Sequence, residues 1–354
     1  MNFFEQISPY LKEKKLDAIL LTSKSSRLYA SSFASDEGIC LVMKSKGFFV
    51  ADFRIYEAVC SNSKLFKPIL IDKSYIKTIK DLCQKNGVKR LGFEEKVLTV
   101  REFSDYSAEL KDIELVPSSE IITNLRMSKL PFEIENIKKA QAVTDLTFEH
   151  ILKYIKPDVK ETDIACEIDF FMRKHGAEKN AFNTIAISGR KTSIPHGVPA
   201  NTKIKSNSFL ILDFGAIVNG YCLDMTRTIA IGNITDEMKK AYNTVLEAQK
   251  AALNILRAGI TGKEADKTAR DIIEKAGYTG AFGHSLGHSI GIDLHEEPRL
   301  SPVNEKELPE NAVVSVEPGI YIKGEFGVRI EDLAVITKNS CENLTKSPKH
   351  LIIL

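Results

Sequence analysis

The chain has 354 residues, of which 43% are hydrophobic and 27% are charged, and its formal net charge is +2. This length exceeds a typical single core and predicts two domains. The small net charge argues against nucleic-acid or membrane-surface binding, which needs concentrated basic patches. We expect no signal peptide, and no run approaches the roughly 18 apolar residues of a transmembrane helix. Six scattered cysteines without a C-x-x-C pair are typical of reduced thiols, so we expect a cytoplasmic protein.

Residues 1–123 alternate between helical and extended patterns, which predicts an N-terminal α/β domain. The pattern opens with an amphipathic helix and a buried strand, continues through a β-hairpin, and ends with three strands that helices separate. We find no catalytic constellation in this domain. The helix is expected at 3–16, and the strands at 18–21, 39–43, 48–50, 68–71, 90–93 and 113–116.

Residues 124–354 begin with long helical patterns and then turn to loops and strands. Proline is favoured in a first helical turn, so a helix is expected to begin at Pro131, and Pro157 is expected to stop it. Glycines mark the C-terminal ends of three later helices. The apolar segment 351–354 predicts a docked strand. Helices are expected at 131–156, 161–175, 235–258 and 261–277, and strands at 185–188 and 209–213.

Two aspartates flank a predicted hairpin in the second domain. Asn219-Gly220 is the strongest signal for a two-residue turn. A turn there sets Asp213 opposite Thr226, and Asp224 then lies on the same face, about 7–8 Å away diagonally. Two carboxylates at that separation can share a pair of metal ions roughly 3.5–4 Å apart.

Other interpretations of this segment remain open. One aspartate could pair with Arg227 while the other lies at a strand end. Asp213 follows a continuous apolar strand, however, and buried acids must be paired or metal-bound. Cys222 precedes Asp224 by two residues, and a small buried apolar residue is a simpler interpretation of it than a metal ligand.

A second apolar strand, 313–316, runs directly into Glu317, and Glu331 follows in the returning segment. The positions 317 and 331 are centred on Gly324, so a hairpin through 323–327 would set the two glutamates opposite each other. Either glutamate alone could be a surface residue. Beside the aspartate pair, the pattern favours a second half of one acidic site.

Three histidines lie in a glycine-rich segment of a chain with only seven. His284 and His288 have the H-x-x-x-H spacing, but Ser285 stands where a zincin requires glutamate. The surrounding glycines also argue against a helix. A glycine-rich loop that carries His284, His288 and His295 is typical of an active site.

Charge balance favours two metal ions. Two divalent ions bring four positive charges, which the four carboxylates of Asp213, Asp224, Glu317 and Glu331 balance, leaving His288 as a neutral ligand. A water that bridges the ions would lose a proton near neutral pH and become the nucleophile. Oxygen-rich ligation suits Mn²⁺, and also Co²⁺ or Zn²⁺.

In this order, the motifs resemble those of the pita-bread metallopeptidases, which include methionine aminopeptidase, aminopeptidase P and prolidase. The resemblance covers about residues 127–354, and the preceding domain resembles that of proline peptidases and creatinase. It implies an α/β (α+β) fold with an N-terminal creatinase-like domain and a C-terminal pita-bread domain, in which helices flank a curved antiparallel sheet. The motifs are Leu-Asp213-Phe-Gly-Ala, Asp224-Met-Thr-Arg, His284-x-x-x-His288 with His295, Glu317-Pro-Gly-Ile-Tyr and Val-Arg-Ile-Glu331-Asp.

The resemblance implies a metal-binding role for five residues. Asp224 and Glu331 would bridge two divalent ions. Asp213 would complete the coordination of one ion, and His288 and Glu317 that of the other. Glu317 would also shuttle protons as the general base.

The resemblance also implies residues that act on the substrate. His196 would stabilise the tetrahedral intermediate or the leaving group, and His295 would contact the substrate near the scissile bond. Arg329 matches an arginine near the substrate's proline or carboxylate end, and His284 and Tyr321 match supporting positions. From the residues alone, His196 could be a turn histidine, Tyr321 could only pack, and Arg329 could pair with either acid that follows it.

The implied function is a dinuclear-metal peptidase that hydrolyses Xaa-Pro bonds in dipeptides or short peptides, with a slight preference for the dipeptidase. The alternatives are an aminopeptidase P acting on longer peptides, a methionine aminopeptidase, and a non-catalytic binding relative of the fold. The extra domain disfavours the second, and the complete ligand set disfavours the third. We expect a substrate with proline in second position, no nucleic-acid or membrane partner, and a homodimer. The physiological metal and the preferred N-terminal residue stay open.

Overall fold

The computed structural model describes residues 2–156 and 158–354, so the expected helix stop at Pro157 lies outside the described residues. The chain divides into two compact units, Met1–Leu125 and Arg126–Leu354. Within the described ranges, none of the helices combines the length and apolar character that crossing a membrane requires.

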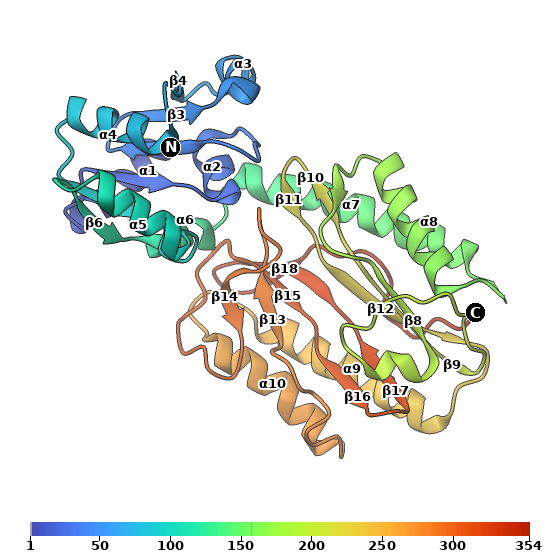
Figure 1. The fold of residues 1–354 in the computed structure, drawn as a ribbon. Helices are drawn as coiled ribbons and strands as arrows, with labels where there is room; N and C mark the ends of the chain where they lie inside the picture. The colour runs from blue at the N-terminus through green and yellow to red at the C-terminus, as the bar shows by residue number, and fades with distance from the viewer. Residues whose placement is uncertain (1, 157) are drawn as a thin grey trace. The chain divides into compact units, whose positions relative to one another are not determined.

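The first unit is a six-stranded mixed sheet in the order β4-β3-β2-β1-β5-β6, with helices on both faces (Figure 1). Alternate residues of β1 enter different cores: Ile19 packs with α1 and α6, and Leu20 packs with α4 and α5. A strand buried on both faces needs the continuous apolar run that its sequence shows. The elements are α1 (Phe3–Glu13), β1 (Ala18–Leu21), α2 (Lys24–Ser31), β2 (Ile39–Met43), β3 (Gly47–Ala51), α3 (Phe53–Asn62), β4 (Phe66–Leu70), α4 (Tyr75–Lys85), β5 (Arg90–Phe93), α5 (Val100–Glu109), β6 (Glu114–Pro117) and α6 (Ser119–Met127).

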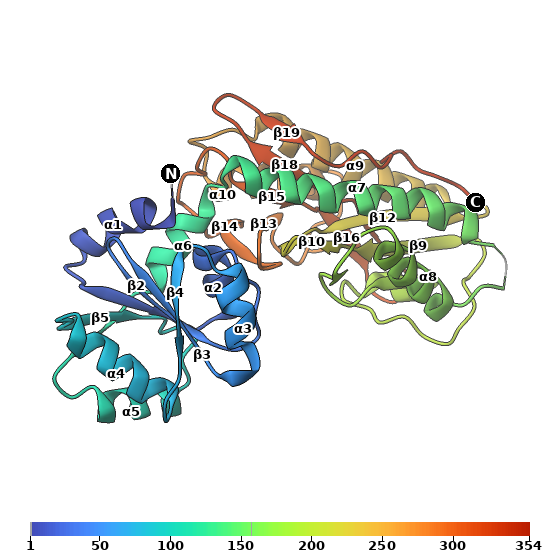
Figure 2. The same cartoon turned by 90° about the horizontal axis from the view of Figure 1, so that it is seen from above.

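The second unit contains antiparallel sheets that two pairs of helices cover (Figure 1, Figure 2). Helices α7 and α8 share a core with β9 and β12, and α9 and α10 share another with β15, β17 and β18. The helices are α7 (Pro131–Tyr154), α8 (Glu161–Lys174), η1 (Gly189–Ser193), α9 (Asp236–Ile255) and α10 (Gly262–Lys275).

Most of the expected site residues lie on or beside strands of three sheets in this unit. One sheet has the order β12-β9-β8, another has the order β14-β13-β15-β18-β19, and β16 pairs with β17. The strands are β7 (Lys179–Asn180), β8 (Ile185–Ser188), β9 (Ser208–Phe214), β10 (Ala216–Val218), β11 (Tyr221–Cys222), β12 (Met225–Ile231), β13 (Gly287–Ser289), β14 (Glu296–Leu300), β15 (Val313–Val316), β16 (Gly319–Ile322), β17 (Phe326–Arg329), β18 (Asp332–Ile336) and β19 (Cys341–Asn343).

Both predicted registers are confirmed. Thr226 lies opposite Asp213, as a turn at Asn219-Gly220 requires, and both turn residues have positive φ. Val316 opposes Asp332 and Gly319 opposes Arg329, so the two pairings continue one register in which positions 317 and 331 face each other. The C-terminal segment is docked as expected, because Ile353 bridges to Ala230.

Candidate active site

One cavity of about 860 Å³ is lined by every residue that the sequence singled out. Strand ends of the two hairpins supply the acids, β13 supplies one histidine, and loops supply the others. Residues up to 135 positions apart, from His196 to Glu331, therefore line the same cavity. They are His196, Asp213, Asp224, His284, His288, His295, Glu317, Tyr321, Arg329 and Glu331.

The centre of this cavity is a tight cluster of acids around one imidazole. Asp224, His288 and Glu331 each offer a ligand atom, and these atoms lie within 4.8 Å of one another. The Nε2 atom of His288 lies 3.4 Å from Glu317 Oε1 and 3.7 Å from Asp224 Oδ2. All of these groups are buried or nearly so, as a metal site that excludes bulk water requires.

Three of the buried carboxylates are incompletely hydrogen-bonded. Among the described residues, none donates to Asp213 Oδ1, Asp224 Oδ1 or Glu331 Oε1. Buried polar atoms normally find a partner, and a buried charge without one is costly. Three oxygens without described donors in one cavity, with the His288 imidazole beside two of the acids, fit a cationic ligand. Carboxylate oxygens and an imidazole nitrogen are ligands that divalent metal ions prefer, so these residues are suited to hold such ions.

Burial among other acids also raises the pKa values of three of the carboxylates in this cavity. Burial raises the pKa of Asp224 well above its usual range, and the neighbouring charges of Glu331 and Asp213 raise it further. Burial likewise raises the pKa of Glu331, with Glu317 as the next cause, and it raises the pKa of Glu317 to about 7. Protein groups alone thus leave the charged forms undercompensated, and bound cations would supply the missing attraction.

His288 has the protonation state of a metal ligand. Burial lowers its pKa to about 3, and the charge of His295 contributes to the shift. Its Nδ1 atom lies 3.1 Å from the Ser289 carbonyl oxygen, which assigns the proton to Nδ1 and leaves the Nε2 lone pair facing the acids.

Arg329 organises one wall of the cavity. Its Nη2 donates to Asp213 Oδ2 at 2.5 Å, and its Nη1 donates to the Tyr321 hydroxyl at 2.8 Å. The Tyr321 hydroxyl also lies 3.0 Å from His284 Nε2. Tyr321 therefore does more than pack. Burial lowers the pKa of His284 to about 4, and the charge of Arg329 is among the further causes.

Two alternative ion pairs are wrong. Arg329 pairs with Asp213 rather than with Glu331 or Asp332, and strand alternation turns Asp332 to the opposite face. Arg227 does not pair with either candidate aspartate, and instead binds Asp332 at 2.7 Å. Cys222 is buried and donates to the Ile292 carbonyl oxygen, away from the acid cluster.

His196 and His295 lie on the accessible side of the cavity. The His295 ring contacts the His288 ring edge to face, with centroids 4.4 Å apart. Burial lowers the pKa of His295, and the charges of Arg299 and His196, which line the same cavity, lower it further. These histidines can reach a substrate bound beside the acids.

The sequence did not identify Arg299. It lies opposite His288 in the β13–β14 pairing and lines the same cavity. A strand prediction for 296–300 would have placed it there, but the interrupting proline weakens that pattern. Phe182, Ile194 and Leu294 add apolar surface to the cavity and carry no comparable signal.

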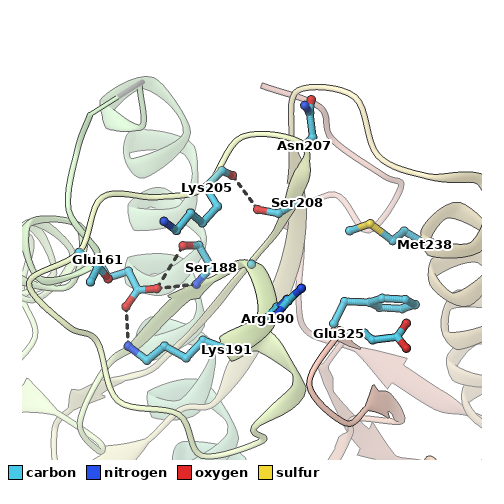
Figure 3. Close-up of a pocket in the computed structure, with 12 residues that line it drawn as sticks. Glu161, Ser188, Arg190, Lys191, Lys205, Asn207, Ser208, Met238 and Glu325 are labelled. Atoms are coloured by element: carbon cyan, nitrogen blue, oxygen red, sulfur yellow. Dashed lines mark hydrogen bonds and ion pairs between the residues drawn. The ribbon is translucent and has the colours of Figure 1, made fainter.

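A second cavity of about 530 Å³ lies beside η1 and contains no metal-ligating cluster among the described residues (Figure 3). Its buried acid, Glu161, accepts hydrogen bonds from Ser188, Lys191 and Ala200. In Figure 3 the side chains of Arg190 and Lys205 point in different directions, so they do not converge on one ligand. The chemistry therefore belongs to the first cavity.

Comparison with known families agrees with this geometry. Residues 135–338 match Metallopeptidase family M24, and residues 4–128 match the Creatinase/Prolidase N-terminal domain. The chain belongs to metallopeptidase family M24. The recognised family, the two-part fold and the assignment as a hydrolase are thereby confirmed.

Relatives of this M24 peptidase match over nearly the whole chain. An uncharacterized peptidase of Bacillus subtilis is 42% identical over 96% of each chain. The solved Xaa-Pro dipeptidase from Bacillus anthracis is 41% identical, with a TM-score of 0.96 over 99% of each chain. The X-Pro aminopeptidase from Thermotoga maritima is 34% identical, with a TM-score of 0.91 over 96% of this chain and 98% of that one.

Proposed function

We propose that this M24 peptidase hydrolyses the bond before proline in Xaa-Pro dipeptides with the help of two divalent metal ions, in the first instance Mn²⁺. The observation that carries the proposal is the set of three buried carboxylate oxygens to which none of the described residues donates, with the neutral imidazole of His288 beside Asp224 and Glu331. Similarity to the Bacillus anthracis structure described as an Xaa-Pro dipeptidase supports the substrate class.

Five residues would hold the ions. Asp224 and Glu331 offer ligand atoms within 4.8 Å of each other and of His288, so they are suited to bridging. We assign Asp213 to one ion, and His288 and Glu317 to the other. When bound, the ions would polarise the substrate carbonyl and lower the pKa of a bridging water, so that a hydroxide nucleophile exists at neutral pH.

The chain's own residues would manage protons and orientation. The nitrogen of a prolyl bond carries no hydrogen, so the departing nitrogen must gain a proton. Glu317 is suited to carry that proton, since Ser315 donates to its Oε1 at 3.1 Å and holds the carboxylate in place. His196 and His295 line the same cavity and can donate where negative charge develops.

A positively charged side chain in the cavity favours the dipeptide as substrate. The donors of Arg329 are committed to Asp213, Tyr321 and backbone or hydroxyl oxygens. Arg299 lines the cavity and, among the described residues, forms no ion pair. A dipeptide presents the proline carboxylate at this point, whereas a longer peptide presents a neutral amide. We therefore assign the substrate carboxylate to Arg299 rather than to Arg329.

The decisive experiment measures the hydrolysis of three peptides by enzyme that has been treated with a chelator and then supplied with Mn²⁺. We expect hydrolysis of Ala-Pro, and neither Ala-Pro-Ala nor Met-Ala-Ala should be cleaved at a comparable rate. Cleavage of Ala-Pro-Ala alone would assign the protein as an aminopeptidase P, which similarity to the Thermotoga maritima enzyme keeps as the second candidate. Cleavage of Met-Ala-Ala alone would indicate a methionine aminopeptidase, and metal-independent or absent hydrolysis would refute the peptidase proposal.

Cytoplasmic location and homodimer formation remain predictions. Sedimentation of the purified protein tests the second, since a mass near twice 39.5 kDa is expected. A single-chain mass would contradict it.

A further inference from the structure

The loop that carries His196 is tied at both ends to one buried carboxylate. Helix α8 begins at Glu161, whose side chain is 1% exposed. Its Oε1 accepts from the Ser188 backbone N–H at 2.7 Å and from the Ser188 hydroxyl at 3.1 Å. Its Oε2 accepts from Lys191 Nζ at 2.6 Å and from the Ala200 backbone N–H at 3.0 Å. Figure 3 shows the Glu161 carboxylate between Ser188 and Lys191.

These bonds close the base of a loop. Ser188 ends β8 and Ala200 leads toward β9, so the two oxygens of Glu161 hold the start and the end of the 188–200 segment together. A charged acceptor binds such donors more strongly than a neutral one.

The middle of the loop rests on β17. The Thr192 hydroxyl accepts from the Gly327 backbone N–H at 2.8 Å, and Arg329 Nη1 donates to the Pro195 carbonyl oxygen at 3.2 Å. A Cβ atom at Gly327 would meet the Thr192 carbonyl oxygen at 2.1 Å, so the two backbones approach too closely for any other residue. The loop therefore has one support on β17 and one at Glu161.

His196 depends on these supports. Its side chain is exposed, and among the described residues none forms a hydrogen bond with its ring. An imidazole without a partner of its own is placed only by the backbone that carries it. Catalytic groups must be held within fractions of an ångström, and misplacement by about 1 Å can cost roughly 100-fold in rate.

We propose that Glu161 is a positioning residue for His196, acting through the closed base of the 188–200 loop. The inference rests on the role proposed for His196 and extends it to a residue outside the catalytic cavity. It assigns a function to a carboxylate that would otherwise count only as a buried, satisfied acid.

The test is a double-mutant cycle on Ala-Pro hydrolysis by the Mn²⁺-loaded enzyme. In Glu161→Gln the side-chain amide turns an N–H toward donors at one end of the loop, so that end loses its acceptor. We expect kcat to fall roughly 10-fold with KM changed less than about twofold, and we expect no further fall when the substitution is added to His196→Ala.

Glu133→Gln is the matched control. Glu133 is another buried acid of the same unit, and it accepts from Tyr221 and Leu130 rather than from the 188–200 loop. Whatever its own effect, it should combine additively with His196→Ala. Additive behaviour of Glu161→Gln with His196→Ala would overturn the positioning role while leaving the proposed reaction intact.

Two further measurements test the positioning role of Glu161 independently of the double-mutant cycle. Hydrogen exchange of the 189–197 amides should be faster in Glu161→Gln than in Glu133→Gln, and unchanged exchange would refute the inference even if the substrate assignment fails. Lys191→Met removes one donor without burying a new group, and it should give a smaller loss that also vanishes in His196→Ala. Full activity of His196→Ala would overturn both the role of His196 and the inference.

Discussion

Glu94 in the first unit and Glu331 in the second are both buried acids that follow a strand, and their surroundings differ sharply. Glu94 is 3% exposed, and its two oxygens accept from the Thr22 and Ser23 backbone N–H groups and from the hydroxyls of Ser23 and Ser26. Glu331 is 1% exposed, and among the described residues its carboxylate accepts a single hydrogen bond, from the Thr226 hydroxyl. A buried acid with a full set of donors holds structure, and one without them marks a site for a cation.

The same contrast separates consecutive residues of the second unit. Asp332 follows Glu331 and accepts from Arg227, Gln249 and Lys349 and also from Asn343. The charges of Arg227 and Lys349 outweigh burial and lower its pKa. Because successive side chains point to opposite faces, one acid of the pair enters the cavity and the other enters a network of cations.

The largest expected effect comes from Glu331→Gln. Changing an outer partner of a metal ligand already costs about 10–100-fold, so loss of a bridging ligand should lower activity by roughly 1,000-fold or more. The metal-free variant should unfold at the same temperature as the metal-free wild type or higher, since a buried charge without donors is removed. Activity on Ala-Pro and thermal unfolding measure the two effects, and retained activity would contradict the bridging role.

Two arginines of the second unit repeat this contrast between a paired and an unpaired charge. Substitution of the one in the cavity should have an effect of intermediate size. Arg227 is buried and donates to Asp332 and to backbone carbonyls, whereas Arg299 lines the cavity and forms no ion pair with any described residue. Arg299→Met should raise KM for Ala-Pro by roughly 10–100-fold, because a charged hydrogen bond to the carboxylate is lost. Ala-Pro amide, which lacks that carboxylate, is the matched substrate. An equal loss on both substrates would show that Arg299 does not bind the carboxylate.

The smallest effect is expected for Glu94→Gln, and it should fall on stability alone. The new amide cannot accept from all of these donors, and an unsatisfied buried group costs about 1–3 kcal/mol. Urea unfolding followed in the first unit should shift to lower concentration, with bound metal and kcat unchanged. A loss of bound metal in this variant would break the distinction between the two kinds of buried acid.

Local rules were sufficient for much of the fold and the acid cluster. The Asn219-Gly220 turn fixed the register of Asp213, and the symmetry of positions 317 and 331 about Gly324 fixed that of the glutamates. Both rest on alternation and turn chemistry, which act over a few residues.

The missed residues depend on contacts between distant segments. Arg299 enters the cavity because β14 pairs with β13, and no short pattern announces that pairing. Glu161 reads in the sequence as an ordinary first-turn acid of a helix, and its partners lie 27 to 39 positions away. Such roles are set by tertiary packing rather than by local preference.

Counting the Mn²⁺ ions bound per chain by equilibrium dialysis of chelator-treated protein, with Ala-Pro hydrolysis followed in the same samples, tests the metal site directly. We expect two ions for the wild type, with activity appearing as they bind, and at most one for Glu331→Gln. A wild-type chain that binds no Mn²⁺, or that cleaves Ala-Pro equally well without metal, would contradict the proposal that these buried acids hold catalytic ions.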